Sequence, residues 1–151
     1  MQPFTLSRLP EIIFGAGRIA DLAGKVESLA GIGAAVLVVA DPMLTKLGLT
    51  GRALESLKAA GLEAQVFDGW KGEPKAAEID AAGAMARAMH AKAIVGLGGG
   101  SALDTAKLVA ACAASGLAVQ SYQLCETPLP KNILPIIAVP TTAGTGSEVT
   151  R

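Results

Sequence analysis

Apolar residues follow two patterns along the chain, and the two patterns alternate. Some runs are apolar at every position, which is typical of strands covered on both faces in a parallel sheet between helices. The clearest runs cover residues 34–40 and 93–97. Shorter runs predict further strands at 4–6, 11–14, 64–67 and 133–139. Pro135 interrupts the last run, which favours an edge strand or an early position in it.

Between these runs, apolar residues return every three or four positions, which predicts helices with one buried side. In residues 18–29, Leu22, Val26 and Leu29 share one side and Lys25 lies on the other. Further helices are expected at 52–60, 76–91 and 102–114, and an irregular segment at 122–131.

The alternation of strands and helices predicts an α/β fold with a mainly parallel sheet, helices on both faces and right-handed connections. A length of 151 residues suits one domain and is short for two. Apolar residues make up 51% of the chain but aromatic residues only 3%, so the core must be built from alanine, valine, leucine and isoleucine.

Charge and cysteine content narrow the function classes. Lysine plus arginine equals aspartate plus glutamate at 13 each, so no net field attracts nucleic acid or an anionic membrane. The sequence has no apolar signal core and no window that would span a bilayer. Cys112 and Cys125 fit neither a disulfide framework nor a paired metal site, which favours reduced thiols in a cytoplasmic protein. His90 is the only histidine, which excludes a multi-histidine metal site within these residues.

A glycine-rich turn follows the apolar run at 93–97. Gly98, Gly99 and Gly100 leave backbone amides uncovered, and Ser101 with Asp104 has the spacing of a capping box at a helix start. Free amides and the positive end of a helix dipole favour a phosphate at this turn. The alternative is a tight strand-to-helix turn with no ligand, because such turns also let a helix pack close to a sheet.

Two other polar segments follow predicted strands. Asp41 comes after the strand at 34–40, and Thr141 and Thr142 come after the strand at 133–139. Because the carboxyl ends of parallel strands share one edge, where ligands of open α/β sheets bind, we expect these residues and the glycine-rich turn to meet in one crevice.

Asp41 is placed to accept hydrogen bonds from both hydroxyls of an adenosine ribose and to repel a 2′-phosphate. The alternative is a turn aspartate before Pro42. The dinucleotide fingerprint Gly-x-Gly-x-x-Gly does not apply, because in that motif the acidic residue follows the glycines, whereas here Asp41 precedes them. A nucleoside-triphosphate loop is also excluded, because it needs Lys-Ser or Lys-Thr after its last glycine and Gly100 is followed by Ser101.

Lys107 forms either an ion pair on the helix surface or a contact near the ligand. Residues 141–150, with little bulk, either wrap a polar ligand or form a flexible linker.

Two motifs together resemble the iron-activated, group III alcohol dehydrogenases: Gly-Gly-Gly-Ser-Ala-Leu-Asp-Thr-Ala-Lys at 98–107 and Pro-Thr-Thr-Ala-Gly-Thr-Gly-Ser-Glu-Val-Thr at 140–150. The pair is highly specific in this order and at this separation. The resemblance implies that residues 1–151 are the N-terminal, Rossmann-like domain of an enzyme that transfers hydride between a small alcohol or aldehyde and the nicotinamide of NAD, with NADP less favoured.

The resemblance also implies a role for each cofactor-binding position. Asp41 would meet the adenine ribose. The pyrophosphate would lie on Gly98, Gly99, Gly100 and Ser101, with Asp104 fixing that turn. The part of the dinucleotide toward the nicotinamide would be lined by Thr141, Thr142, Thr145 and Thr150. One departure is Glu73-Pro74, where many relatives have Asn-Pro.

The same resemblance implies a divalent metal, iron or zinc, held by an aspartate and histidines of a C-terminal helical domain that residues 1–151 lack. The metal would polarise the alcohol oxygen. This chain alone would be inactive and contain no catalytic residue, and the full-length protein would be a homodimer or a larger homo-oligomer. The alternatives are a relative such as glycerol dehydrogenase or maleylacetate reductase, and a non-catalytic nucleotide-binding module.

Overall fold

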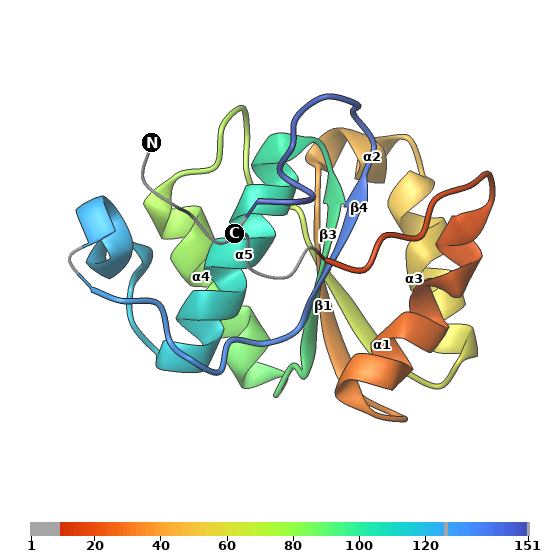
Figure 1. The fold of residues 1–151 in the computed structure, drawn as a ribbon, viewed down its shortest axis with the longest axis horizontal. Helices are drawn as coiled ribbons and strands as arrows, with labels where there is room; N and C mark the ends of the chain where they lie inside the picture. Colours follow the sequence, from red (N-terminus) through yellow and green to blue (C-terminus); the bar gives the residue numbers. More distant parts are fainter. Residues whose placement is uncertain (1–9, 126, 151) are drawn as a thin grey trace, which may run out of the picture.

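The computed structural model describes residues 10–125 and 127–150. Helices and strands alternate, and Figure 1 shows the strands as a central layer with helices on either side. The elements in chain order are η1 (Arg18–Asp21), α1 (Leu22–Ala30), β1 (Ala35–Ala40), α2 (Pro42–Lys46), α3 (Leu49–Ala59), β2 (Glu63–Phe67), α4 (Ala76–Ala88), β3 (Ala93–Gly98), α5 (Gly100–Ser115), η2 (Val119–Cys125) and β4 (Ile136–Pro140).

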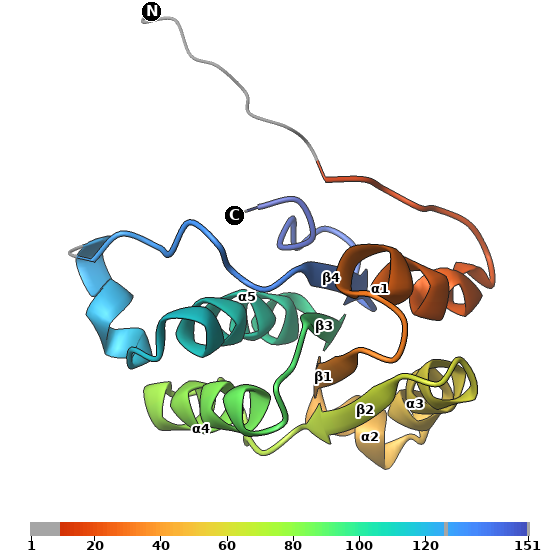
Figure 2. The same ribbon diagram turned by 90° about the horizontal axis from the view of Figure 1, so that it is seen from below.

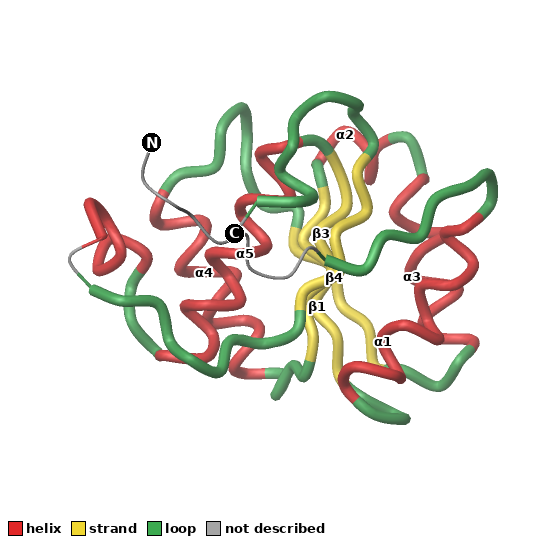
Figure 3. Tube along the Cα trace, in the orientation of Figure 1, coloured by secondary structure: helices red, strands yellow, loops and turns green. Residues whose placement is uncertain are grey.

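The described strands form one parallel sheet in the order β2-β1-β3-β4. In its middle, Val38 of β1 pairs with Val66 of β2 and with Val95 of β3. β4 pairs with β3 and, within the described residues, lies at an edge of the sheet. Figure 3 shows the strands running side by side between the helices. The arrangement confirms the predicted Rossmann-like α/β fold.

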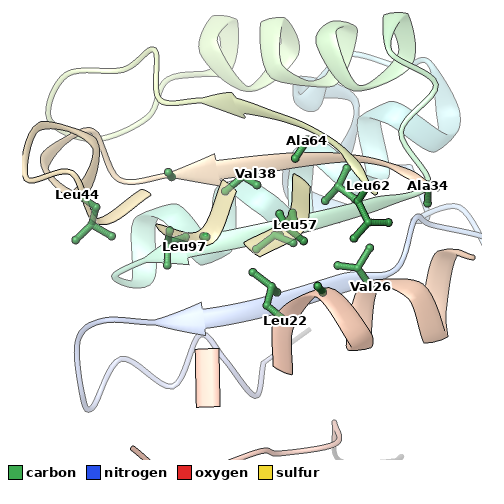
Figure 4. Close-up of a cluster of buried hydrophobic side chains, with 14 residues drawn as sticks. Leu22, Val26, Ala34, Val38, Leu44, Leu57, Leu62, Ala64 and Leu97 are labelled. Atoms are coloured by element: carbon green, nitrogen blue, oxygen red, sulfur yellow. The ribbon is translucent and has the colours of Figure 1, made fainter. Parts of the chain in front are cut away.

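The helices cover both faces of the sheet, and Figures 1 and 2 agree on which helix lies where. On the α1/α3 face, a core of mostly branched side chains includes Leu22, Val26 and Leu57 (Figure 4). On the α4/α5 face, the helices contribute mainly alanines, which are Ala82, Ala86, Ala102, Ala106 and Ala110. Residues of β1 alternate between the two cores, so the strand is buried on both sides as its sequence predicts.

The predicted strand at residues 11–14 is wrong. The expected strand at 4–6 lies outside the described residues, and residues 11–14 form no strand. Ile12 is 67% exposed and Phe14 is 97% exposed. An apolar run becomes a strand only where another strand offers hydrogen bonds to it, and residues 11–14 have no such neighbour among the described residues.

Element boundaries also differ from the prediction. The helix expected at 18–29 begins as η1 and continues as α1. α4 ends at Ala88 rather than near Ala91, because the chain must turn into β3 and His90 has a φ of 54°. β4 begins after Pro135, whose carbonyl oxygen still accepts the N–H of Ile94 at 2.9 Å. η2 occupies the start of the segment expected to be irregular.

Within residues 10–125 and 127–150, we find no helix with the length and apolar character needed to cross a membrane.

Candidate functional site

Three strand exits meet at the carboxyl edge of the sheet, as the sequence predicts. The backbone N–H of Asp41, just after β1, donates to the carbonyl of Leu97 in β3 at 2.9 Å. The N–H of Thr141, just after β4, donates to the carbonyl of Gly98 at 2.9 Å. The turn after β3 is therefore bracketed by Asp41 on one side and by Thr141 on the other.

The glycines of this turn are required by close approach. Gly98 has a φ of 152°, and a Cβ placed on it would lie 2.7 Å from the Cβ of Ala102 and 2.9 Å from the Cβ of Asp41. A Cβ on Gly99 would lie 3.2 Å from the hydroxyl oxygen of Thr142. A side chain on Gly98 would therefore push apart α5 and the segment at Asp41, and a side chain on Gly99 would crowd Thr142.

Helix α5 begins within the same turn and presents free amides. Gly99 is the N-cap, and its carbonyl accepts the N–H groups of Ala102 and Leu103 at 3.1 Å each. In the described part of the chain, the N–H groups of Gly100 and Ser101 have no backbone acceptor. Two unpaired donors at the positive end of a helix dipole suit an anion.

The predicted capping box is wrong. Helix α5 starts at Gly100, so Ser101 is its second residue and no side chain caps the helix. The hydroxyl of Ser101 instead donates to Glu73 Oε2 at 2.8 Å. The sequence gives no sign of this contact, because Glu73 lies far from Ser101 along the chain. Both residues line an open hollow of about 340 Å³ beside α5, together with Pro74, Ile79, Gly100, Asp104, Thr105 and Leu108.

Asp104 joins α5 to residues 141–150. Its Oδ2 accepts the hydroxyl of Ser147 at 3.1 Å, and its Oδ1 accepts Lys107 Nζ at 2.9 Å. Lys107 Nζ also donates to the hydroxyl of Thr150 at 2.7 Å. The helix-surface ion pair considered for Lys107 is therefore present, and the same ammonium holds a second segment. Residues 145–150 are therefore held against α5.

The side chain of Asp41 caps the next helix. Its Oδ1 accepts the N–H of Met43 at 2.8 Å, and Pro42 is the first residue of α2. One carboxylate oxygen of Asp41 therefore has the alternative role, that of a turn residue before Pro42. Within the described residues, Oδ2 has no hydrogen-bond partner, so the residue can cap α2 and accept a ligand hydroxyl together.

The threonines are spread along the site. Thr141 and Thr142 lie at the glycine-rich turn, whereas Thr145 packs near Gly100 with its hydroxyl donating to Glu148 Oε2 at 3.0 Å. Thr150 lies beside Lys107, about two helical turns beyond Ser101. Thr142 and Thr145 thus lie against the glycines of the turn, whereas Thr150 lies farther along α5.

No group of three or more histidine, cysteine, aspartate or glutamate side chains gathers among the described residues in a way that could hold a metal. The donors present at this edge are backbone amides, hydroxyls and separate carboxylates. They fit a phosphate ester with sugar hydroxyls, and they do not fit a transition metal.

The chain is similar to known oxidoreductases over nearly its whole length. The family described as iron-containing alcohol dehydrogenase matches residues 10–151. Choline dehydrogenase of Bacillus subtilis is 35% identical over 154 residues, which cover 100% of this chain and 38% of that protein. Sulfoacetaldehyde reductase of Bilophila wadsworthia is 36% identical, with 93% and 35% covered. This chain therefore spans well under half the length of these curated relatives.

Solved structures agree with the sequence comparison. Sulfoacetaldehyde reductase of Bifidobacterium kashiwanohense, in complex with NAD+, superposes with a TM-score of 0.86 at 30% identity, covering 99% of this chain and 39% of that one. NADH-dependent butanol dehydrogenase A of Thermotoga maritima superposes with a TM-score of 0.87 at 30% identity, covering 99% and 37%. With the family match over residues 10–151, these similarities show that the chain belongs to the iron-containing alcohol dehydrogenase family.

Proposed function

We propose that this chain is the NAD-binding domain of an alcohol dehydrogenase that interconverts a small alcohol and its aldehyde. The nicotinamide of the bound dinucleotide accepts or donates the hydride. The chain's own part is to bind the dinucleotide and to fix its orientation at the carboxyl edge of the sheet.

One observation carries this proposal. Two unpaired amides at the start of α5 lie between a carboxylate on the β1 side and a row of hydroxyls on the β4 side. A dinucleotide has the same order of groups, with a ribose, a diphosphate and a second ribose with its base. Asp41 would accept the hydroxyls of the adenine ribose, and Gly98, Gly99, Gly100 and Ser101 would surround the diphosphate.

The remaining proposed contacts lie toward the nicotinamide. Thr141 and Thr142 offer hydroxyls next to the glycine-rich turn, and Thr145 and Thr150 continue that row along α5. Asp104 acts indirectly, since both of its carboxylate oxygens already accept hydrogen bonds from side chains of the chain.

The metal belongs to another part of the enzyme in this proposal. The described residues do not assemble a metal site. We therefore propose that residues 1–151 are the N-terminal domain and that iron or zinc is held by a C-terminal helical domain. Catalysis needs both domains, so residues 1–151 alone are expected to be inactive. Location in the cytoplasm and a homo-oligomeric state stay predictions.

Titration of the full-length protein with NAD+, NADP+ and inorganic diphosphate tests the proposal. We expect saturable binding of NAD+, weaker binding of NADP+, and competition between diphosphate and NAD+. Turnover with a series of primary alcohols then separates an alcohol dehydrogenase from a non-catalytic nucleotide-binding module. The same series, extended to glycerol and maleylacetate, tests the two related activities. Absence of NAD+ binding by the full-length protein would exclude the proposal.

A further inference from the structure

Residues 147–150 are held on α5 by a closed ring of hydrogen bonds to side chains that lie about one to two helical turns beyond the glycine-rich turn. Lys107 Nζ donates to Asp104 Oδ1 at 2.9 Å and to Thr150 Oγ1 at 2.7 Å. Ser147 Oγ donates to Asp104 Oδ2 at 3.1 Å, and Thr150 Oγ1 donates to the Ser147 carbonyl at 3.4 Å. We call these residues, Asp104, Lys107, Ser147 and Thr150, the α5 clasp.

The clasp is partly enclosed. The side chain of Lys107 is 18% exposed and Ser147 as a whole is 7% exposed, whereas the side chain of Asp104 is 57% exposed. Burial of these polar atoms is compensated because each of them has a partner within the ring. An ammonium shared between a carboxylate and a hydroxyl forms charge-assisted bonds, which are stronger and shorter than neutral ones.

The residues next to the clasp are also folded tightly. The N–H groups of Val149 and Thr150 donate to the Gly146 carbonyl at 3.0 and 3.2 Å, and the N–H of Ser147 donates to the Thr145 hydroxyl at 3.3 Å. Residues 145–150 therefore form a compact turn. Moving Ser147 or Thr150 would carry the rest of this turn with it.

The clasp sets the distance between this turn and the free amides of α5. A Cβ placed on Gly100 would lie 3.2 Å from Ser147 Oγ and 3.4 Å from the Cβ of Thr145. The turn thus lies directly against the start of α5, and its contact depends on bonds made about one helical turn further along the helix, at Asp104, and about two turns further, at Lys107.

We propose that Lys107 and Ser147 are positioning residues, which hold residues 141–150 against α5 so that Thr142 and Thr145 already face the glycine-rich turn before the dinucleotide binds. This inference rests on the proposed function. Neither side chain needs to touch the cofactor. Fixing a binding segment in advance removes the entropy cost of ordering it on binding, so the gain appears as affinity.

The decisive variant is Lys107→Met, which keeps the aliphatic stem of the side chain and removes both hydrogen bonds. We expect the Kd of the full-length protein for NAD+ to rise about fivefold to twentyfold, as for the loss of partly exposed charge-assisted bonds. Lys107→Arg keeps a charged donor and should recover most of the affinity. Ser147→Ala should weaken binding in the same direction.

Hydrogen exchange of the ligand-free protein provides a second measurement. Its rates would not change if Lys107 acted only by touching the cofactor. In the ligand-free Lys107→Met protein, the amides of Val149 and Thr150 should exchange faster, while amides of β1 and β3 keep their rates. The matched control is Lys25→Met, which breaks the Lys25–Glu11 ion pair of 2.6 Å outside the site. This control should change neither the Kd for NAD+ nor the hydrogen exchange of the Val149 and Thr150 amides.

The outcomes separate the two proposals. If the wild-type protein binds NAD+ and Lys107→Met leaves both the Kd and the exchange rates unchanged, the clasp does not position the segment and the inference is overturned. If exchange accelerates but the Kd stays constant, the clasp is structural only, which also overturns it. If the wild-type protein does not bind NAD+, the proposed function itself fails.

Discussion

The two faces of the sheet are built from different residues and do different work. On the α1/α3 face, branched side chains such as Leu22, Val26 and Leu57 fill the space between helix and strand. On the α4/α5 face, a Cβ on Gly96 would lie 2.9 Å from the Cβ of Ala106, so α5 lies close against β3. The branched side chains bury apolar area, whereas the small residues bring the start of α5 to the strand exits. We therefore expect stability and cofactor binding to respond differently to substitutions on the two faces.

The largest expected effect separates these roles. Leu57→Ala on the α1/α3 face removes a fully buried side chain and leaves a cavity. The free energy of unfolding should fall by about 2–5 kcal/mol, measured by urea denaturation. The Kd of the folded protein for NAD+, measured well below the unfolding transition, should stay unchanged. A higher Kd for NAD+ in this variant would show that the α1/α3 face also sets the geometry of the site.

Gly98→Ala is the converse substitution, on the α4/α5 face. The added methyl would meet the Cβ of Ala102 at 2.7 Å and that of Asp41 at 2.9 Å, at a φ of 152°. Overpacking should lower the unfolding free energy by about 1–3 kcal/mol. Because Asp41 must move, the Kd for NAD+ should rise roughly tenfold or more.

The matched control for this variant is Gly51→Ala. A Cβ on Gly51, within α3, meets nothing within 4 Å, so this variant should keep the affinity and raise the unfolding free energy by about 0.5–1 kcal/mol, because alanine favours a helix over glycine. Equal effects of the two alanines would contradict the argument from close approach.

Much of this fold could be predicted from the sequence. β1 and β3 are apolar at every position, which is typical of strands buried between two helical layers, and both strands are buried along their length. Residues 11–14 carry a similar but shorter signal, yet they remain exposed because strand formation depends on a neighbouring strand. The local apolar pattern shows which residues prefer to be buried. Whether they form a strand depends on a neighbouring strand supplied by the rest of the chain.

The site shows the same division. Its position could be predicted, since strand direction alone brings Asp41, the glycine-rich turn and Thr141 to one edge. The capping box failed because the spacing between Ser101 and Asp104 does not fix where the helix begins. The contacts of Glu73 and Ser147 join residues far apart in sequence, and no spacing rule reports such pairs.

Asp41 lies where the two faces meet, since it caps α2 and contacts the glycine-rich turn. Asp41→Ser removes the charge and keeps a side chain that can cap a helix. Because the carboxylate repels a 2′-phosphate, we expect the preference for NAD+ over NADP+ to fall about tenfold, from titrations of both cofactors. Asp41→Ala, which also loses the cap, should cost about 1 kcal/mol of stability in addition. An unchanged ratio of the two Kd values would refute the role of this carboxylate.

The smallest expected effect probes how tightly α4 and α5 pack. Cys112 of α5 is buried, and a Cβ on Gly83 of α4 would lie 3.0 Å from its Cβ. Burial raises the pKa of the Cys112 thiol, as does the charge of Asp80, while Arg87 opposes them. The folded state therefore holds the thiol proton more firmly than the unfolded chain. This contribution to stability is complete below the ordinary thiol pKa and is lost as the pH rises toward the raised value.

Iodoacetamide labelling, followed by peptide mapping to separate Cys112 from Cys125, checks this last expectation. In the native protein at neutral pH, Cys112 should react at least about tenfold more slowly than in urea, because the thiolate is scarce and access requires local opening. Gly83→Ala should accelerate labelling by forcing the two helices apart, without changing the Kd for NAD+, since the contact lies away from the start of α5. If Cys112 reacted as fast in the native protein as in urea, close packing would be confined to the strand side of α5, and the α4/α5 face would owe its geometry to Gly96 and Gly98 alone.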